Sequence, residues 1–463
     1  MSISSDIVSA LVAVTGIEWA RTDDASLLRY GTDALLRGRA ADLVLLPGDS
    51  GEVAAIVRLC HQHRVPLVVR GAGTGYSGGS VPVRGGVVIA MERLDRILAI
   101  DEENMLAVVQ PNVITGDLQD AVEARGLFYP PDPASLRQSA LGGNVAEGAG
   151  GPRALKYGTT RRYVLALEAV LPTGEIVRTG SKAVKNVVGY DLTQLLVGSE
   201  GTLAVLTEIT LRLVPKPAVT ATLRATFTDI ATAVAAATAM MRARVVPATL
   251  ELVDAESLAA VAARLGRQVV RPDTGALLLV EVDGLPAGVE EEIERVRGAC
   301  LDAGATDVLR AFSAIEREEI WEARRELSFA LRALAPLKIN HDVVVPRGRI
   351  PQLFALIDGL RRRYQLLIPC FGHAGDGNIH VNLMIDPADA DQLSRARAAE
   401  AALFQGVVDL EGSITGEHGI GFAKARYLGL ELSADVIALM QRIKHAFDPH
   451  GILNPGKIWE YEE

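Results

Sequence analysis

The stretch of sequence that decides the fold is Val65-Pro66-Leu67-Val68-Val69-Arg70-Gly71-Ala72-Gly73-Thr74-Gly75-Tyr76-Ser77-Gly78-Gly79. Its apolar, β-branched start predicts a strand, which leads directly into a loop dense in glycine. Glycine leaves backbone N–H groups uncovered by side chains, so several of them can converge on one anion. The stretch therefore predicts a loop that binds a phosphate or pyrophosphate, and a surface turn without a ligand is the alternative.

The glycine spacing also fits the dinucleotide-binding pattern G-x-G-x-x-G at Gly73, Gly75 and Gly78. That pattern has to open a helix whose N-terminus carries the pyrophosphate. Residues 80–89 instead read Ser-Val-Pro-Val-Arg-Gly-Gly-Val-Val-Ile, which is typical of strand and turn. We therefore expect a dinucleotide pyrophosphate in a β-rich setting that is not a Rossmann fold.

Length and composition describe a globular, enzyme-sized chain. Its 463 residues predict two or three domains. The net charge of −10, without a basic cluster that contains aromatic residues, argues against nucleic-acid binding. The three cysteines are Cys60, Cys300 and Cys370, and they form neither a C-x-x-C motif nor a disulfide framework, which fits a reducing compartment.

The sequence also bears on location. No apolar run approaches ~18 residues, so no transmembrane segment is expected. The N-terminus lacks the basic region of a secretory signal. We expect a cytoplasmic protein, with peripheral attachment to a membrane through a partner left open.

The hydrophobic pattern predicts small α+β units rather than one long parallel series. The expected elements of the first part are a helix over 49–60, a helix over 113–125, strands at 65–69, 87–91, 98–100 and 106–109, and a hairpin of 164–171 with 176–179. From about residue 218 to about residue 412 we expect one inserted α+β domain. Its elements are helices over 230–244 and 289–303 and strands at 277–282 and 308–312. The turn-rich tail at 448–457 is expected to return to the first domain.

Two further glycine clusters lie at 141–151 and 195–206, and the run Pro130-Pro131-Asp132-Pro133 precedes the first of them. Small residues at this density allow the backbone to approach a flat ligand closely.

A second chemical site is predicted around His373 and His380, which lie seven residues apart. The glycines between them argue against a helix. If Asp376-Gly377 is a two-residue hairpin turn, His373 lies directly opposite His380 and both project to the same side, with Asn382 on that same face.

Two facing imidazoles make a metal pair that a carboxylate would complete, and Glu417 in Gly416-Glu417-His418-Gly419 is the candidate. Neighbouring His418 cannot share the direction of Glu417 on a strand, so it is a candidate for proton transfer. Structural histidines and a solvated Glu-His turn are the alternative. Three of the chain's eight histidines fall in these two glycine-rich motifs, which favours a site.

Five motifs in this order resemble those of the FAD-linked oxidase family, which includes D-lactate dehydrogenase, the flavin subunit of glycolate oxidase and D-2-hydroxyglutarate dehydrogenase. They are Arg70-Gly71-Ala72-Gly73-Thr74-Gly75…Gly78-Gly79, Gly142-Gly143-Asn144-Val145-Ala146, Gly198-Ser199-Glu200-Gly201-Thr202-Leu203, Gly372-His373…Asp376-Gly377-Asn378-Ile379-His380 and Gly416-Glu417-His418-Gly419. The resemblance spans nearly the whole chain.

The resemblance implies an α+β, two-domain fold of the vanillyl-alcohol-oxidase/p-cresol-methylhydroxylase type. It implies an FAD domain over 1–217, an α+β substrate (cap) domain over 218–412, and a C-terminal segment, 413–463, that returns to the FAD domain.

The resemblance also assigns residues to roles. For FAD these are Arg70, Gly71, Ala72, Gly73, Thr74, Gly75, Ser77, Gly78, Pro131, Gly142, Gly143, Asn144, Ala146, Glu200, Gly201, Val205 and Asn454. It makes His373, His380 and Glu417 ligands of a divalent metal, with zinc the default and manganese or iron as alternatives. His418 matches the catalytic base, and Arg324, Lys338 and Asn382 match substrate contacts. Residues 70–80 contain no histidine or cysteine, so FAD is expected to be non-covalent.

The activity implied is oxidation of a small D-2-hydroxy acid, D-lactate or glycolate, to the 2-oxo acid by hydride transfer to flavin. D-2-hydroxyglutarate dehydrogenase and a flavin electron-transfer subunit without its own substrate are the alternatives. The electron acceptor is left open among a quinone, a cytochrome, electron-transfer flavoprotein, an iron–sulfur subunit and oxygen.

Overall fold

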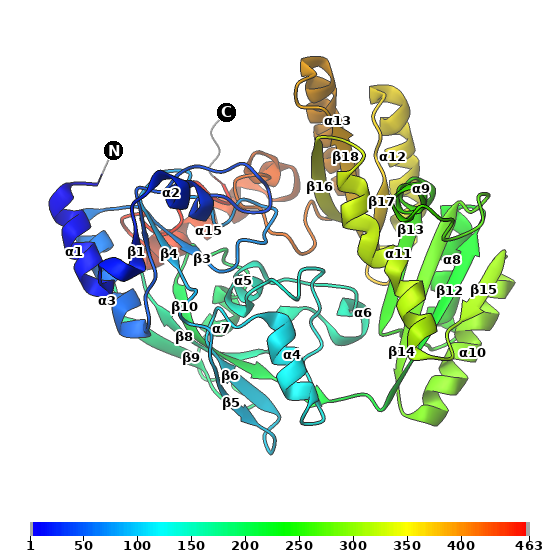
Figure 1. The fold of residues 1–463 in the computed structure, drawn as a ribbon, viewed down its shortest axis with the longest axis horizontal. Helices are drawn as coiled ribbons and strands as arrows, with labels where there is room; N and C mark the ends of the chain where they lie inside the picture. Colours follow the sequence, from blue (N-terminus) through cyan, green and yellow to red (C-terminus); the bar gives the residue numbers. More distant parts are fainter. Residues whose placement is uncertain (1–2, 460–463) are drawn as a thin grey trace. The chain divides into compact units, whose positions relative to one another are not determined.

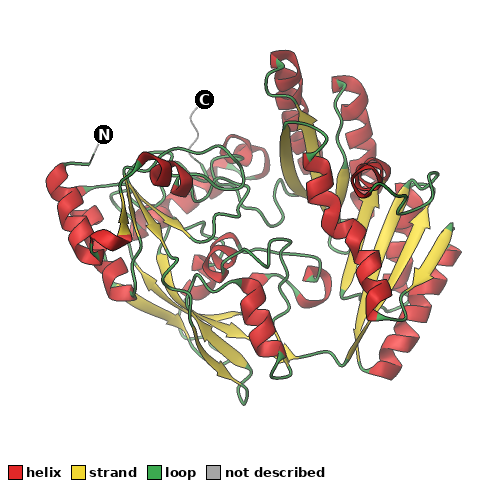
Figure 2. Cartoon of the chain, in the orientation of Figure 1, coloured by secondary structure: helices red, strands yellow, loops and turns green. Residues whose placement is uncertain are grey.

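The computed structural model describes residues 3–459 and divides into two compact units. Unit 1 contains the chain up to Gly150, Thr159–Lys216 and the chain from Glu417 onward. Unit 2 contains Gly151–Gly158 and Pro217–Gly416. Figure 1 labels the helices and strands of both units, and Figure 2 separates helices from strands by colour.

The first sheet of unit 1 has four strands in the order β1-β2-β4-β3. Strands β2, β4 and β3 run parallel, and β1 is antiparallel at the edge. The strands are β1 Ala20–Arg21, β2 Leu43–Leu45, β3 Leu67–Arg70 and β4 Val87–Ala90, with helices α1 Ser5–Thr15, α2 Asp24–Tyr30 and α3 Ser50–His63. Side chains of α1 and α3 share one hydrophobic core with β2, β3 and β4.

Helix α3 illustrates why the sequence folds as it does here. Asp49 accepts the N–H of Glu52 at 2.8 Å and so caps the helix. Val53, Ile56, Val57 and Cys60 recur at helical spacing and are buried. The helix predicted over 49–60 is confirmed.

The second sheet of unit 1 has five antiparallel strands in the order β5-β6-β10-β8-β9. They are β5 Ile97–Asp101, β6 Leu106–Val109, β8 Val164–Val170, β9 Ile176–Gly180 and β10 Val205–Arg212. Helices α4 Thr115–Glu123, α5 Leu141–Glu147 and α7 Leu192–Leu196 belong to this part, and β7 Leu127–Phe128 pairs with β11 Val214–Pro215. The hairpin predicted for β8 and β9 is confirmed.

The glycine-rich stretch forms the connection between β3 and β4. Residues 71–86, all within the described chain, contain no helix, as their composition predicts. The C-terminal segment, with α14 Leu428–Glu431 and α15 Ala434–Phe447, supports this connection. The backbone N–H groups of Phe422 and Ala423 both donate to the carbonyl of Ser77 at 3.2 Å. Lys457 Nζ donates to the carbonyl of Val81 at 2.6 Å.

Unit 2 is built on a seven-stranded antiparallel sheet in the order β15-β12-β14-β13-β17-β18-β16. Its strands are β12 Val219–Phe227, β13 Thr249–Asp254, β14 Ala276–Gly284, β15 Asp307–Arg310, β16 Leu337–Val344, β17 Cys370–His373 and β18 Asn378–Ile385. The helices are α6 Ala154–Tyr157, α8 Ile230–Arg242, α9 Ala255–Leu265, α10 Pro286–Asp302, α11 Ala314–Arg332, α12 Ile350–Tyr364 and α13 Ala390–Asp409.

Helices α9 and α11 cover one face of this sheet and share a hydrophobic core with it. Figure 1 shows α11 running across the strands. Val253, Leu277, Leu279, Phe371 and Met384 point from the sheet into this core. Side chains alternate along a strand, so the residues two positions from these lie on the same face.

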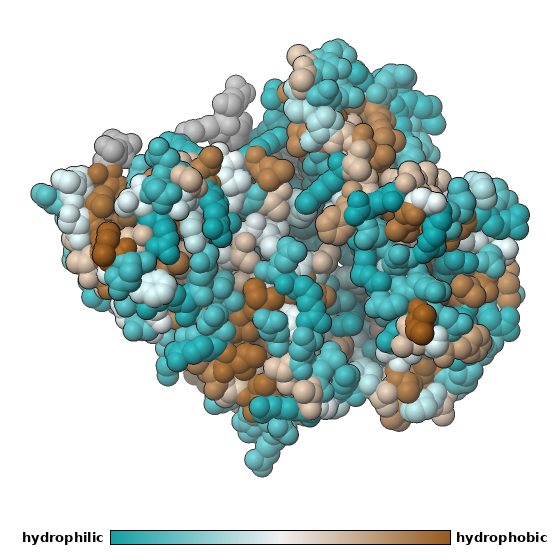
Figure 3. Space-filling view, in the orientation of Figure 1, coloured by the Kyte–Doolittle hydropathy of each residue, from teal (hydrophilic) through white to brown (hydrophobic). Residues whose placement is uncertain are grey.

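The face seen in Figure 3 is mainly hydrophilic, with separate apolar patches. Within residues 3–459, no helix has both the length and the apolar character needed to cross a membrane.

Candidate functional site

The two predicted metal-ligating histidines lie on neighbouring strands of unit 2. His373 ends β17, and His380 lies in β18. The register pairs His373 with Asn378 and Phe371 with His380. The predicted two-residue turn with His373 opposite His380 is therefore wrong, because residues 374–377 form a longer loop.

The two imidazoles nevertheless share one face of the sheet, since Phe371 and His373 are two residues apart and Phe371 is opposite His380. Their ring centroids are 5.4 Å apart. Both side chains are buried. A diagonal pair has replaced the predicted direct pair and still brings the rings together.

A carboxylate that the sequence prediction missed lies beside them. Glu251 pairs with His373 in the register of β13 and β17 and is completely buried. One of its oxygens contacts His373 Nδ1, and the other accepts from Arg324 Nε at 2.6 Å. Burial raises the pKa of this carboxyl, but the interactions with His373 and Arg324 outweigh burial and lower its pKa to about 2. Its signal in the sequence is an acid that stands among the apolar residues Leu250, Leu252 and Val253.

Arg324 reaches this face from α11. Its guanidinium carbon lies 4.8 Å from the centroid of the Phe371 ring. The side chain is mostly buried against that ring and against Glu251. The structure thus brings Arg324 to the face that carries the two histidines.

The other two predicted substrate contacts, Asn382 and Lys338, form hydrogen bonds with other side chains of unit 2. Asn382 is completely buried, its amide nitrogen donates to the carbonyls of Pro369 and His380, and its amide oxygen accepts from Asn340 at 2.7 Å. These bonds use both N–H groups of the Asn382 amide and one of the two acceptor positions of its oxygen, so the substrate contact assigned by resemblance stays a prediction. Lys338 Nζ donates to Ser328 Oγ at 3.2 Å, and burial, with the nearby charge of Arg332, lowers the lysine pKa to about 8.

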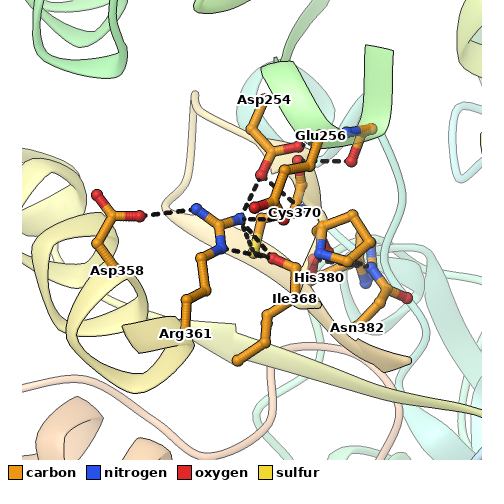
Figure 4. A network of polar contacts seen from close by, with 10 residues as sticks. Asp254, Glu256, Asp358, Arg361, Ile368, Cys370, His380 and Asn382 are labelled. Atoms are coloured by element: carbon orange, nitrogen blue, oxygen red, sulfur yellow. Dashed lines mark hydrogen bonds and ion pairs between the residues drawn. The ribbon is translucent and has the colours of Figure 1, made fainter. Parts of the chain in front are cut away.

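An arginine network fixes the start of β17, three residues before His373 (Figure 4). Arg361 of α12 donates to Asp254 and to Asp358, at 2.7 Å in each case, and also to the carbonyl of Ile368. Asp254 in turn accepts the N–H of Cys370 at 2.9 Å. Buried charges need such partners, and here they tie β13, α12 and β17 together.

Glu417 completes the predicted ligand set. It follows Gly416, whose N–H donates to Asp342 Oδ2 at 2.9 Å. One ligand atom from each of His373, His380 and Glu417 lies within 4.8 Å of the others. Of the three, Glu417 is the least buried.

In the predicted phosphate loop of unit 1, one glycine borders open space and another is packed against a side chain. Gly75 has no heavy atom within 4 Å of the position that a Cβ would occupy, and its φ is not positive. Gly73 has φ +71° and lies against the Arg70 guanidinium, which donates to the carbonyl of Thr32 at 2.7 Å. Ser77 Oγ is buried and has no hydrogen-bond partner within the described chain. An unsatisfied hydroxyl beside open backbone fits a loop that takes a polar ligand.

The second glycine cluster forms helix α5, which was not predicted. Gly143 is open in the same way as Gly75, while Gly142 packs on Pro111. Gly71 of the loop lies close to this helix, because a Cβ there would be 3.9 Å from the Gly143 nitrogen. Ala146 is half-buried, and the Asn144 amide donates to Thr115 Oγ1 at 2.6 Å.

Several other predicted cofactor residues instead support the framework. Glu200 is buried and accepts the N–H groups of Ile420 at 2.8 Å and Gly421 at 2.6 Å. Burial is the main influence on its carboxyl and raises the pKa. The Asn454 amide donates to the carbonyls of Gly79 at 2.9 Å and Glu200 at 2.7 Å. The remaining predicted positions are buried Gly78, Pro131 and Val205, with the more accessible Ala72, Thr74 and Gly201. Val205 packs in the hydrophobic core.

The predicted base lies beside the phosphate loop. The ring centroids of His418 and Tyr76 are 5.4 Å apart. His418 Nδ1 is buried, whereas Nε2 is the nitrogen that lies 3.9 Å from Glu417 Oε1. Both rings belong to unit 1.

Comparison with known families identifies the two parts of this arrangement. Residues 41–180 match a family described as an FAD binding domain, and residues 216–458 match one described as the C-terminal domain of FAD linked oxidases. The chain belongs to the FAD-linked oxidases.

Named relatives cover almost the whole of this FAD-linked oxidase. The "glycolate oxidase subunit GlcD" of Bacillus subtilis is 42% identical over 99% of this chain and 97% of that protein. The Escherichia coli K12 protein of the same name is 38% identical over 98% of this chain and 91% of its own. A "D-lactate dehydrogenase" of Anaerostipes hadrus is 37% identical over 91% of this chain and 90% of that protein.

Solved structures establish the fold. A p-cresol methylhydroxylase with substrate bound gives a TM-score of 0.80 at 17% identity over 98% of this chain and 96% of that one. The 4-ethylphenol oxidase of Gulosibacter chungangensis gives 0.80 at 20% identity over 100% and 98%. The predicted two-domain fold of the vanillyl-alcohol-oxidase/p-cresol-methylhydroxylase type is confirmed.

Asp33 is another buried acid that the sequence prediction missed. It lies near Arg70, and its Oδ1 accepts the N–H of Leu35 at 3.1 Å. Its Oδ2 is buried without a hydrogen-bond partner within the described residues. Burial raises the pKa of this carboxyl to about 6.

Asp33→Asn should therefore stabilise the FAD-free protein at neutral pH. A carboxyl whose pKa is raised by folding contributes stability below its unfolded pKa and loses it as the pH rises through about 6. Relative to wild type, the variant should gain up to ~3 kcal/mol in free energy of unfolding at pH 7, and the gain should shrink toward pH 4. Denaturant melts across this range measure the difference. Asp101→Asn is the control, and its free energy of unfolding at pH 7 should fall rather than rise. The reason is that hydrogen bonds from Asn104 lower the pKa of Asp101.

Proposed function

We propose that this FAD-linked oxidase oxidises a short D-2-hydroxy acid, D-lactate or glycolate, to the 2-oxo acid. The observation that carries the proposal is the cluster of His373, His380 and Glu417, with Arg324 on the same sheet face as the two histidines. The names of the relatives, glycolate oxidase subunit and D-lactate dehydrogenase, support the same substrate class.

The donor set of the cluster fits a divalent cation. Two imidazoles and one carboxylate suit zinc, with manganese or iron as alternatives, and leave coordination positions open for a chelating hydroxy acid. His373 is held by Glu251, as a ligating histidine commonly is by an outer carboxylate.

FAD, when bound, would supply the acceptor for the hydride that leaves the substrate Cα, and the cation would lower the pKa of the hydroxyl. His418 takes the hydroxyl proton at Nε2, because its Nδ1 is buried. Arg324 offers its two terminal nitrogens to the substrate carboxylate, since Nε already bonds Glu251. Oxidation thus splits the H–O–C–H unit into a hydride, which leaves carbon, and a proton, which goes to His418.

For FAD, we assign the pyrophosphate to the loop from Arg70 to Gly78 and part of the flavin to α5 at Gly142, Gly143 and Ala146. Three observations support this: the unsatisfied Ser77 hydroxyl, the open backbone at Gly75 and the open backbone at Gly143. Glu200 and Asn454 hold the surrounding backbone. No histidine or cysteine lies in residues 70–80, so acid precipitation should release the flavin intact.

Gly75→Ala and Gly143→Ala should weaken FAD retention without unfolding the protein. A methyl group at either position meets no protein atom, so any loss reports on the ligand that fills the space. Flavin absorbance per mole of purified protein measures retention, and the thermal midpoint of the FAD-free protein checks the fold. Gly298→Ala in α10, which is equally open, is the control and should retain FAD. Full FAD content in both loop variants would contradict this assignment.

Metal removal and base removal should have separable effects. Chelation, or His380→Ala, should stop flavin reduction by D-lactate while the protein stays yellow, because the proposed FAD ligands belong to unit 1. His418→Ala should keep both zinc and FAD but slow flavin reduction by roughly 10²–10⁴-fold. Anaerobic stopped-flow absorbance and metal analysis measure these effects. Full-rate reduction in metal-free protein would remove the metal from the proposal, and zinc loss in the His418 variant would make that histidine a ligand.

One observation favours D-2-hydroxyglutarate as a second candidate substrate. Ser328, which holds Lys338, lies four residues after Arg324 on α11. Lys338 is the register partner of Met384, whose side chain lies on the sheet face that carries the two histidines, so a second cation is placed on the same face as Arg324 and suits a second carboxylate.

Lys338→Met should distinguish the two substrates. If the second carboxylate binds at Lys338, the variant should raise the KM for D-2-hydroxyglutarate at least ~10-fold and leave the KM for D-lactate unchanged. In wild type, the KM for the dicarboxylate should rise as the pH passes above about 8, because Lys338 then loses its proton. Steady-state assays with an artificial dye measure both. Equal effects on the two acids would exclude Lys338 from this discrimination.

The experiment that tests the main proposal is an anaerobic screen of 2-hydroxy acids for bleaching of the flavin spectrum. D-lactate or glycolate should bleach it. No bleaching by any 2-hydroxy acid would favour an electron-transfer subunit without its own substrate. Two relatives are named as subunits of an oxidase, which supports a protein partner as electron acceptor.

A further inference from the structure

We propose that Glu251 is a positioning residue that couples the metal ligand His373 to the substrate arginine Arg324. The inference rests on the proposed function and names a residue that this function does not itself require. Glu251 is completely buried, and each of its carboxylate oxygens has a different partner, His373 Nδ1 for one and Arg324 Nε, at 2.6 Å, for the other.

The contact with His373 selects one tautomer of the imidazole. An ionised carboxylate can only accept hydrogen bonds, so Nδ1 has to carry the proton. Nε2 then holds the lone pair and becomes the nitrogen available to a cation. Since Glu251 and His373 are register partners on β13 and β17, the sheet fixes this orientation.

The contact with Arg324 fixes the plane of the guanidinium. Nε is held by Glu251, and the group lies over the Phe371 ring, with its central carbon 4.8 Å from the ring centroid. Nη1 and Nη2 are then presented as a fork, the geometry that binds a carboxylate through two parallel hydrogen bonds. Glu251 therefore orients the two groups that would hold opposite parts of one small substrate.

A carboxylate with a purely structural role would give different experimental results from a positioning residue. A buried ion pair that only anchors α11 to the sheet would affect stability but not the metal and substrate sites together. Positioning requires both oxygens to accept at once. Glu251→Gln keeps the size of the side chain but replaces one accepting oxygen with a donating NH₂ group, so His373 or Arg324 loses its acceptor.

The test compares the FAD-loaded E251Q variant with wild type. Zinc affinity, measured by competition with a chelator, should fall about 10–100-fold. With zinc restored to saturation, the KM for D-lactate should still rise at least ~10-fold. Both changes are expected, because the amide carries no charge: the partner that keeps the oxygen loses the charge-assisted strength of its hydrogen bond, and the other partner faces a donor.

The matched control is Glu281→Gln. Glu281 lies on the neighbouring strand β14 and on the same sheet face, opposite Thr249, but its carboxylate accepts from Trp321 at 2.8 Å and Thr222 at 2.6 Å. It also connects the sheet to α11. This variant should keep wild-type zinc affinity and KM, even where its thermal midpoint falls.

Wild-type zinc affinity and KM in E251Q would overturn the proposal, whatever its thermal midpoint. A change in only one of the two would overturn the coupling. If E251Q does not fold, ¹⁵N NMR of zinc-free, histidine-labelled wild-type protein decides instead, because His373 has to be protonated at Nδ1, and protonation at Nε2 would overturn the proposal. Failure of wild type to bind zinc or to be reduced by a hydroxy acid would refute the proposed function, whereas the tautomer of His373 reports on Glu251 alone.

Discussion

The parallel pairing of β3 with β4 is the constraint on which the cofactor half depends. Neighbouring parallel strands need a long connection, and a helix usually provides it. Here residues 71–86 make the connection without a helix, so their backbone groups need partners elsewhere. Ser77, Gly79 and Val81 find them in the C-terminal segment. The glycine-rich loop thus makes the connection, and the C-terminal segment supplies the hydrogen-bond partners that the loop backbone needs.

In unit 2 the governing constraint is the burial of charge. Asp254, Glu251 and the arginines that pair with them lie within or against the central strands. A buried charge is tolerated only with partners of good geometry, so each pair also fixes the elements that carry it. The Arg361 network holds β17 at its start, and Glu251 holds it at its end. The histidines are thereby presented on strands that have little freedom to move.

Local patterns predicted much of this structure. The N-capped helix α3, the strands around the first glycine loop and the hairpin of β8 and β9 follow from sequence periods and turn residues. The register at His373 did not, because Asp376-Gly377 is a good two-residue turn that competes with a longer loop. Glu251 and Asp33 were missed because their roles depend on partners distant in the sequence. Asn382 and Val205 were assigned by resemblance, and both are buried, so their contacts with a ligand stay predictions.

Because Phe422, Asn454 and Lys457 support the loop, the order of synthesis decides when the loop can form. A ribosome makes the glycine loop early and these three residues near the end of the 463-residue chain. A nascent chain that already contains the whole first sheet still lacks the groups that hold this loop. The loop therefore becomes complete only after the C-terminal segment has been translated, so a ligand of this loop can be held only from that point on.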